Sequence, residues 1–266
     1  MMIKTQTLGR LAVIFLCVAA VAAVGCSDKK KPPVPLAEVP VDFAALAASG
    51  EQIYLIGLVS DPKNPSVKPQ YNYIMRSSAE LSGDNVIISD RLTLSGRKYQ
   101  TALTCQKNSL LSLIRSTLTV TEGGTVVQTV SVTITGGFAE LVDSTGKTSS
   151  IDYPNNTLTQ AALFRLVTRL PKEKGGSFSF SYYSDPMNTL VEKSAPDKPF
   201  LIECRGPATA KVLDAEVPCT LFVLTGTKRE VSLYVDDQSR LRLMETDQGA
   251  TRMQMITPEQ ASEYEK

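Results

Sequence analysis

Alternating side chains dominate this sequence and set the strongest limit on what it can fold into. Short runs in which every second residue is apolar, most of them rich in β-branched or aromatic residues, recur with turn-forming residues between them. Such period-two runs are typical of β-strands with one buried face. We therefore predict strands at residues 52–59, 71–77, 85–89, 110–121, 125–135, 177–183, 219–224, 231–235, 240–245 and 252–256.

Short turn sequences join several of these runs. Glu122-Gly123-Gly124, Thr225-Gly226-Thr227 and Asp236-Asp237-Gln238-Ser239 each separate two predicted strands by a few residues. This spacing favours hairpins, and consecutive hairpins produce an antiparallel meander.

One amphipathic helix is predicted at residues 158–170. Its start is marked by Thr157 with Gln160, which match a capping box, and its end by Pro171. Arg165 and Arg169 fall outside its apolar face, which consists of Leu158, Ala162, Leu163, Leu166, Val167 and Leu170. We expect this face to lie on the concave side of a curved sheet, with a weaker second helix at residues 41–49. The predicted fold class is mainly β (α+β), a curved antiparallel sheet or half-barrel with one principal helix.

The first 26 residues carry a targeting pattern. Lys4 and Arg10 precede an apolar segment at residues 11–24 that is too short to span a membrane, and Ala23-Val24-Gly25-Cys26 follows. This pattern resembles the signal of bacterial lipoproteins. The resemblance implies a diacylglycerol thioether on Cys26, usually with an acylated amine such as a palmitate amide, and hence a membrane anchor. The alternative is an ordinary signal peptide that leaves Cys26 as a free or paired thiol.

The residues after Cys26 indicate to which membrane the protein is sorted and how far its domain lies from the lipid anchor. Ser27 at the next position is compatible with the outer membrane in the sorting rule of this family, while Asp28 leaves the inner membrane open. We expect a protein of the cell envelope, anchored by lipid and facing the periplasm. The Lys29–Lys31 run and four prolines predict an extended tether within residues 26–50, whose cations can contact anionic headgroups.

Charge and length exclude some classes of protein. Removal of residues 1–25 takes away Lys4 and Arg10 and no acid, so 26 Lys and Arg face 27 Asp and Glu in the remaining 241 residues. A chain this close to neutral is not expected to present the large positively charged surface that binds nucleic acid. We expect one β-rich globular domain at residues 51–256 and a polar tail at residues 257–266.

Three further cysteines, Cys105, Cys204 and Cys219, follow the predicted signal. An oxidising compartment favours a disulfide, and we predict a Cys204–Cys219 bond because these two lie closest together in neighbouring strand-like segments. Cys105 is then the odd thiol. We expect it to be a buried small apolar residue, because its neighbours offer no cation to activate it.

The chain contains no histidine, and this limits its chemistry more than any motif. Ser-His-Asp and Cys-His mechanisms and histidine-ligated metals are excluded, and no nucleotide-binding glycine motif is present. We expect no enzymatic activity, no metal and no cofactor, with a carboxylate or Ser/Lys hydrolase as the remaining alternative. Asp236-Asp237 is interpreted as a polar hairpin.

Three other polar positions, Asp61, Asn64 and Asp84, are interpreted as turn residues and not as calcium ligands, because they lack the spacing of a binding loop. Asn155-Asn156-Thr157 fits a glycosylation sequon. In a chain with this signal we interpret it as a turn and helix cap.

An aromatic cluster is the best candidate for a ligand-binding surface. Phe178, Phe180 and Tyr182 share one face of a predicted strand, with Tyr183 on the other. With helix residues they form the candidate ligand-binding set: Leu163, Phe164, Phe178, Phe180 and Tyr182. If this face lines an open cavity, it can bind an acyl chain or another apolar ligand. The alternatives are that the same residues fill a core or contact a partner protein.

The order of elements adds a family resemblance. A long meander, an interrupting helix and the pair Val231-Ser-Leu-Tyr-Val-Asp-Asp and Arg240-Leu-Arg-Leu-Met-Glu is similar to half-barrels of the Lol-type lipoprotein-carrier superfamily. The resemblance implies a sheet wrapped around a helix with an apolar cavity. Our leading hypothesis is a non-enzymatic envelope lipoprotein that binds a lipid or other apolar ligand there. The alternative is a structural or assembly-partner lipoprotein with a fully packed core.

Overall fold

The computed structural model describes residues 31–59, 69–94, 96–184, 191–246 and 250–265. The chain divides into two units, Met1–Lys31 and Pro32–Lys266, and the β-sheet fold belongs to the second. The predicted signal, the lipid-attachment residue Cys26, and the turn residues Asp61 and Asn64 lie outside the described residues.

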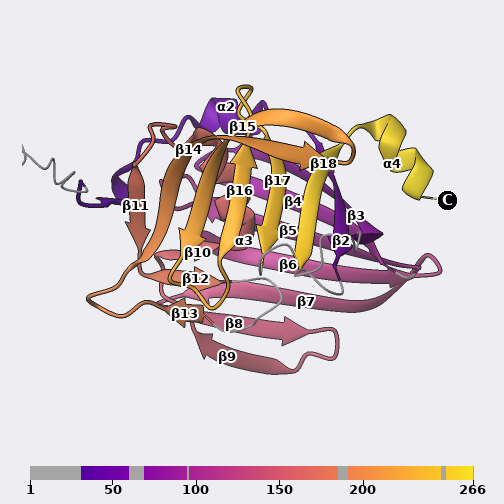
Figure 1. The fold of residues 1–266 in the computed structure, drawn as a ribbon. Helices are drawn as coiled ribbons and strands as arrows, with labels where there is room; N and C mark the ends of the chain where they lie inside the picture. Colours follow the sequence, from indigo (N-terminus) through magenta and orange to yellow (C-terminus); the bar gives the residue numbers. More distant parts are fainter. Residues whose placement is uncertain (1–30, 60–68, 95, 185–190, 247–249, 266) are drawn as a thin grey trace, which may run out of the picture. The chain divides into compact units, whose positions relative to one another are not determined.

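A single curved sheet of fifteen strands forms most of the fold (Figure 1). Its order is β1-β11-β14-β15-β16-β17-β18-β2-β3-β4-β5-β6-β7-β8-β9. The strands are β1 (Val34–Pro35), β2 (Gln52–Leu58), β3 (Gln70–Ser82), β4 (Asn85–Leu94), β5 (Arg97–Gln106), β6 (Leu113–Glu122), β7 (Thr125–Thr135), β8 (Phe138–Asp143), β9 (Thr148–Asp152), β11 (Ser177–Phe180), β14 (Phe200–Val212), β15 (Ala215–Thr225), β16 (Val231–Val235), β17 (Leu241–Thr246) and β18 (Thr251–Ile256).

Two meanders meet in this sheet. From β2 to β9, and again from β14 to β18, each strand pairs antiparallel with the next one along the chain, as the hairpin sequences predicted. The last strand of the second meander, β18, pairs with β2, the first strand of the other. The sheet is open, and the predicted fold class is confirmed.

Among the described residues, a small second sheet and five short helices complete the fold. The small sheet has the order β10-β12-β13. Its strands are β10 (Thr157–Thr159), β12 (Tyr182–Ser184) and β13 (Val191–Lys193); the helices are η1 (Leu36–Glu38), α2 (Phe43–Ala47), α3 (Gln160–Leu166), η2 (Val167–Arg169) and α4 (Pro258–Tyr264).

The principal helix lies where it was predicted, inside the curve of the sheet, but it is shorter than expected. Leu163 and Leu166 of α3 belong to one core cluster together with residues of both meanders. The predicted cap at Thr157 is wrong: the side chain of Thr159 accepts the Ala162 N–H at 3.1 Å. The physical reason is that the backbone of Thr157–Thr159 pairs with β12, so the helix begins only after that strand.

The tip between β16 and β17 confirms the interpretation of Asp236 as a hairpin residue. Its carboxylate accepts the Arg240 N–H at 2.8 Å and Nε–H at 2.9 Å, and it is almost completely buried. A carboxylate used in this way closes a turn and is not available as half of an acid–base pair.

The two ends of the predicted domain differ from the expectations. The tether becomes part of the fold from Val34 onward, because β1 pairs with β11 and Leu36 is buried. The predicted polar tail forms α4, which begins with a capping box between Thr257 and Gln260 and buries Ala261. The predicted second helix corresponds to α2.

Candidate interaction surface

Most of the candidate ligand-binding residues lie in a packed core. Leu163, Phe178 and Phe180 are buried, and Phe164 packs against the same cluster. The ring centroid of Phe180 lies 5.5 Å from that of Phe200 and 6.3 Å from that of Tyr183. These contacts are those of a filled core, in which side chains interdigitate without large voids.

Tyr182 was predicted to share the face of Phe178 and Phe180, and this is wrong. The run at residues 177–183 breaks at Ser181, because β11 pairs with β14 while β12 moves into the small sheet. Tyr183 is therefore the buried residue, and Tyr182 is half-buried with the Lys193 Nζ atom 5.9 Å from its ring centre.

The predicted Cys204–Cys219 disulfide is also wrong, since all three described thiols are free and buried. In the β14–β15 ladder Cys204 faces Phe222 and Cys219 faces Ala208. Three residues of a strand span roughly 10 Å, more than the ~7 Å across which a disulfide can form. The two thiols also belong to different apolar clusters.

Burial disfavours the thiolate form of these three cysteines. It raises the pKa of Cys105 to about 12 and that of Cys219 to about 11, and it raises the pKa of Cys204 as well. Cys105 is fully buried in the main core, which confirms the prediction that it is a buried small apolar residue.

A buried polar network ties α3 to the first strands of the sheet. Arg165 is only 3% exposed, and its guanidinium donates to Ser77 Oγ at 2.6 Å and to Ser49 Oγ at 3.3 Å. Asp90 faces Ser77 across β3 and β4, and its Oδ1 atom is buried without a hydrogen-bond partner among the described residues. Sequence periodicity placed Arg165 outside the apolar face of the helix. It could not show that the side of the helix that carries Arg165 is buried as well.

Desolvation dominates the electrostatics of this network. Burial raises the pKa of Asp90, although the hydrogen bond from Ser77 and the charge of Arg165 act against the shift. Burial lowers the pKa of Arg165 and raises that of Tyr54, whose hydroxyl donates to Gln52. The hydrogen bonds from Arg165 to Ser49 and Ser77 connect α3 to the segment after α2 and to β3, so the network positions α3.

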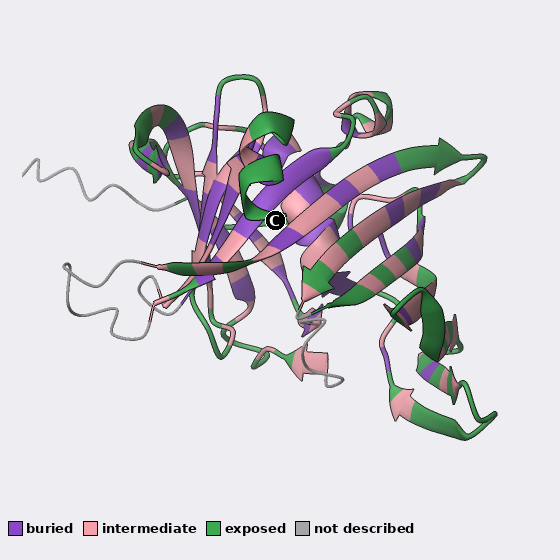
Figure 2. Ribbon diagram, turned by 90° about the vertical axis from the view of Figure 1, so that its right-hand side faces the viewer, coloured by how far each residue is buried: buried purple, intermediate pink, exposed green. Residues whose placement is uncertain are grey.

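Strands β6–β9 form an uncovered part of the sheet, which we call the wing. In these four strands only Val120 and Ala139 are buried, and β7 and β9 contain no buried residue. By contrast, β16 buries every second residue. Figure 2 shows the difference, with buried residues gathered on the strands around the helix and exposed residues along the outlying strands.

The wing exposes large apolar side chains. Val126 is 57% exposed, Val127 50% and Phe138 52%, and Ile114 and Val142 are exposed as well. Phe138 borders an open hollow of about 470 Å³ that Thr135, Glu140 and residues 148–150 also line. Exposed apolar groups that lie together mark interaction sites more often than isolated ones do. Phe138 and Val142 both lie on β8, beside the edge strand, whereas Val126 and Val127 lie at the other end of β7.

The outer edge of the wing can accept another strand. β9 is the last strand of the sheet and has β8 as its neighbour among the described residues. An edge strand presents unpaired N–H and C=O groups, and natural proteins usually shield such edges. β9 has the sequence Thr-Ser-Ser-Ile-Asp, which contains neither proline nor lysine.

The inner face of the wing continues the face of the core. The ladders place Ile88, Leu103, Ser116, Val132 and Leu141 in one cross-strand row, in that order. Ile88 and Leu103 are buried, whereas Val132 and Leu141 are half-buried. The row thus passes from packed core to partly open surface.

Membrane-spanning helices and metal clusters are both missing from the described part of the chain. None of its helices is long and apolar enough to cross a membrane. No three of its His, Cys, Asp or Glu side chains gather as metal ligands would.

Comparisons with known proteins place this fold only broadly. No family model and no curated protein matches the chain. A similar solved structure is that of a β-barrel-like protein of a domain of unknown function, DUF1849, from Brucella abortus, with 12% identity and a TM-score of 0.42. The likeness covers 78% of this chain and 95% of that chain, and it carries no implication for function.

Proposed function

We propose that this protein is a non-enzymatic, lipid-anchored envelope protein that acts as an assembly partner through its wing. The observation that carries the proposal is the contrast in burial: the strands around α3 pack a filled core, while β6–β9 leave both faces largely open. The predicted ligand residues fill that core, which favours the assembly hypothesis over the carrier hypothesis.

The wing suits a protein partner that adds a strand. Backbone pairing along β9 would supply hydrogen bonds without requiring a particular sequence, and the exposed Phe138 and Val142 side chains of the neighbouring strand β8 would supply apolar contact area. Envelope proteins rich in β-structure offer edges of this kind.

Photo-crosslinking in growing cells tests this proposal. A photoreactive residue at Phe138 should give a crosslinked product of one defined mass, and Val142→Asp, on the same strand, should abolish that product. Leu81 on β3 is the matched control, since it is 40% exposed and lies outside the wing. Equal crosslinking from Leu81 and from the wing would refute the proposal.

A second candidate function rests on the inner face of the wing. The half-buried Val132 and Leu141 continue the apolar row of the core, and an acyl chain could lie along them. In that case Val132→Asp should remove lipid that co-purifies with the protein, while Thr133→Asp, on the opposite face of β7, should not.

The anchor is part of the proposal and has its own test. The residues from Lys4 to Cys26 support lipidation, and Ser27 supports export to the outer membrane. Labelling of cells with radioactive palmitate should mark the protein, and Cys26→Ala should abolish the label and release the protein from membranes. A labelled Cys26→Ala protein would contradict the anchor.

A further inference from the structure

A slit opens between β17 and β18 at one rim of the sheet. Their ladder runs from Thr246↔Thr251 to Leu243↔Gln254 and stops there. Yet β17 continues to pair with β16 as far as Leu241, and β18 continues to pair with β2 as far as Ile256. The first two residues of β17 and the last two residues of β18 are therefore not paired with each other.

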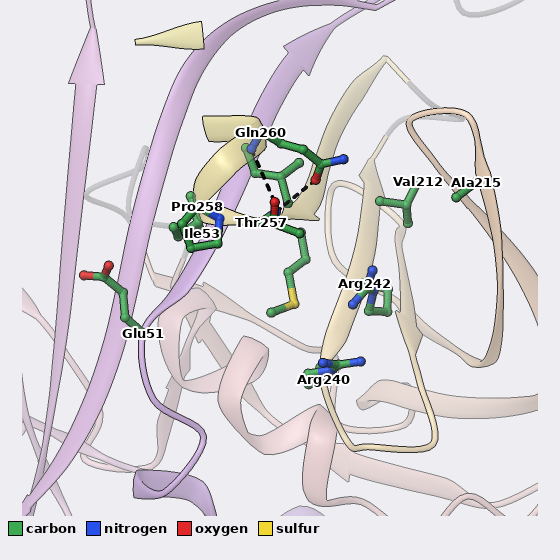
Figure 3. A pocket seen from close by; sticks show the side chains of 11 residues that line it. Glu51, Ile53, Val212, Ala215, Arg240, Arg242, Thr257, Pro258 and Gln260 are labelled. Carbon is green, nitrogen blue, oxygen red and sulfur yellow. Dashed lines mark hydrogen bonds between the residues drawn. The ribbon is translucent and has the colours of Figure 1, made fainter. Parts of the chain in front are cut away.

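A cavity of about 320 Å³ occupies this slit. Arg240 and Arg242 line one side and Met255, Ile256 and Thr257 the other, as Figure 3 shows for the labelled residues. The remaining lining residues come from the start of β2, from the β14–β15 hairpin and from α4: Glu51, Ile53, Val212, Ala215, Pro258 and Gln260. The volume lies at the small end of the range for ligand pockets.

The guanidinium group of Arg242 is incompletely paired with other groups of the described chain. Its Nε atom is buried and has no hydrogen-bond partner among the described residues, and its nearest carboxylate oxygen there, Asp236 Oδ2, is 3.9 Å from NH1. Arg240 already holds that oxygen, with its NH2 atom at 2.9 Å and its Nε–H donating at 2.9 Å. The Arg242 side chain is 20% exposed and lines the cavity, so a bound anion can approach its guanidinium group.

The one carboxylate that lines the cavity is neutralised. Glu51 accepts from Arg76 at 3.2 Å and forms a second ion pair with Arg91. Asp236 Oδ2 is shared by Arg240, at 2.9 Å, and by Arg242, at 3.9 Å, so within the described part of the chain one carboxylate faces two positive charges at the cavity. Its surroundings therefore favour an anion.

We propose that the slit binds a small amphiphilic anion, a carboxylate or phosphate monoester on a short apolar chain. Arg242 holds the anionic oxygen atoms, because a guanidinium matches carboxylate and phosphate in geometry and charge. Ile53, Val212, Met255 and Ile256 supply the apolar wall for the chain. The site goes beyond the assembly function, since no residue of the wing lines it.

Calorimetric titration of a soluble form that begins at Ser27 tests the site. Hexanoate and hexyl phosphate are the probes, hexanol is the neutral control, and acetate and inorganic phosphate are the controls without a chain. We expect both amphiphilic anions to bind with an affinity in the millimolar range or better. Arg242→Gln should weaken binding about tenfold or more, as loss of a charged hydrogen bond predicts.

Two further variants keep the result interpretable. Ala215→Phe, at an exposed position on the hairpin, should block the cavity without removing a charge, and it serves if Arg242→Gln does not fold. Arg97→Gln is the matched control, because it removes an arginine paired with Glu122 far from the lining and should leave binding unchanged.

Three results would overturn the assignment. Absence of binding of either amphiphile at about 10 mM would exclude the site, and equal binding of hexanol would show that no anion is recognised. Acetate or phosphate binding as tightly as the longer probes would contradict the apolar wall. None of these results bears on crosslinking from the wing, so the two proposals fail independently.

Discussion

Replacement of Arg165 by methionine removes the cation at the centre of the buried network. Arg165 is 3% exposed and connects α3 to Ser77 and Ser49. Methionine keeps the helix propensity and much of the apolar length of the side chain. The carboxylate of Asp90, which already has one unpartnered buried oxygen among the described residues, then loses the charge that partly offsets its desolvation. Breaking a buried charge interaction from one side costs ~3–5 kcal/mol of unfolding free energy.

The loss should depend on pH in a defined direction. Burial holds the pKa of Asp90 above its ordinary value, so the folded state binds this proton more tightly than the unfolded state. The contribution of Asp90 to stability is therefore most favourable below the unfolded pKa and is lost as pH rises through the folded pKa. Because Arg165 lowers that pKa, the variant should raise it further. Its destabilisation should be larger at about pH 7 than at about pH 4.

Urea unfolding at both pH values, followed by far-ultraviolet circular dichroism because the chain has no tryptophan, measures this. Asp90→Asn in the Arg165→Met background should restore part of the stability at neutral pH, since it replaces the stranded carboxylate with a neutral amide. A loss below ~1 kcal/mol, or an equal loss at both pH values, would refute the coupling between Arg165 and Asp90.

Three other predictions concern the packing. Leu166→Ala, at a position that is 1% exposed, should lower the unfolding free energy by ~2–5 kcal/mol, measured in the same urea assay; a loss below ~1 kcal/mol would contradict a packed core. Gly57→Val should cost ~1–3 kcal/mol by thermal or urea unfolding, because even a Cβ atom there would come within 2.5 Å of the Tyr71 ring. Cys105, Cys204 and Cys219 should resist alkylation in the native protein at neutral pH and should all react in denaturant without a reductant. An intact mass two hydrogens lower would instead indicate a disulfide.

Strands whose alternation is clean could be predicted from the sequence. Residues 231–235 and 125–135 correspond to β16 and β7 without any shift. Period-two patterns identify strands with one buried face, whereas β5 (Arg97–Gln106) and β9 are largely polar and escaped prediction. β9 is held in the sheet by its pairing with β8, whereas β5 also buries Leu103 and Cys105 in the main core.

Long-range pairing also explains the errors in the candidate site. Thr157 and Gln160 match a capping box in sequence, but β10 uses the backbone of Thr157 for a strand, and Thr159 caps the helix instead. Tyr182 lost its place in the core because β12 leaves the main sheet. Closeness in sequence suggested a Cys204–Cys219 bond, but the register keeps the two thiols apart. Sequence patterns show which side chains share a face of a strand. The register of that strand, and the sheet to which it belongs, depend on residues far away in the sequence.

The wing and the slit were beyond the reach of sequence analysis for a related reason. β7 alternates valine and threonine as a half-buried strand would, and nothing in that pattern shows that the sheet continues without cover. The slit exists because two ladders end at different residues. Arg242 could be recognised only when its missing partner was known.

The most direct test of the packed core is native mass spectrometry with lipid extraction on the form that begins at Ser27, purified gently from the periplasm. A filled core around Leu163 and Phe180 predicts a mass equal to that of the chain, no co-purifying lipid, and no uptake of an apolar dye into that core. Stoichiometric lipid that is lost in Leu163→Asp or Phe180→Asp, in a protein that still folds, would contradict the packed core and restore the carrier hypothesis.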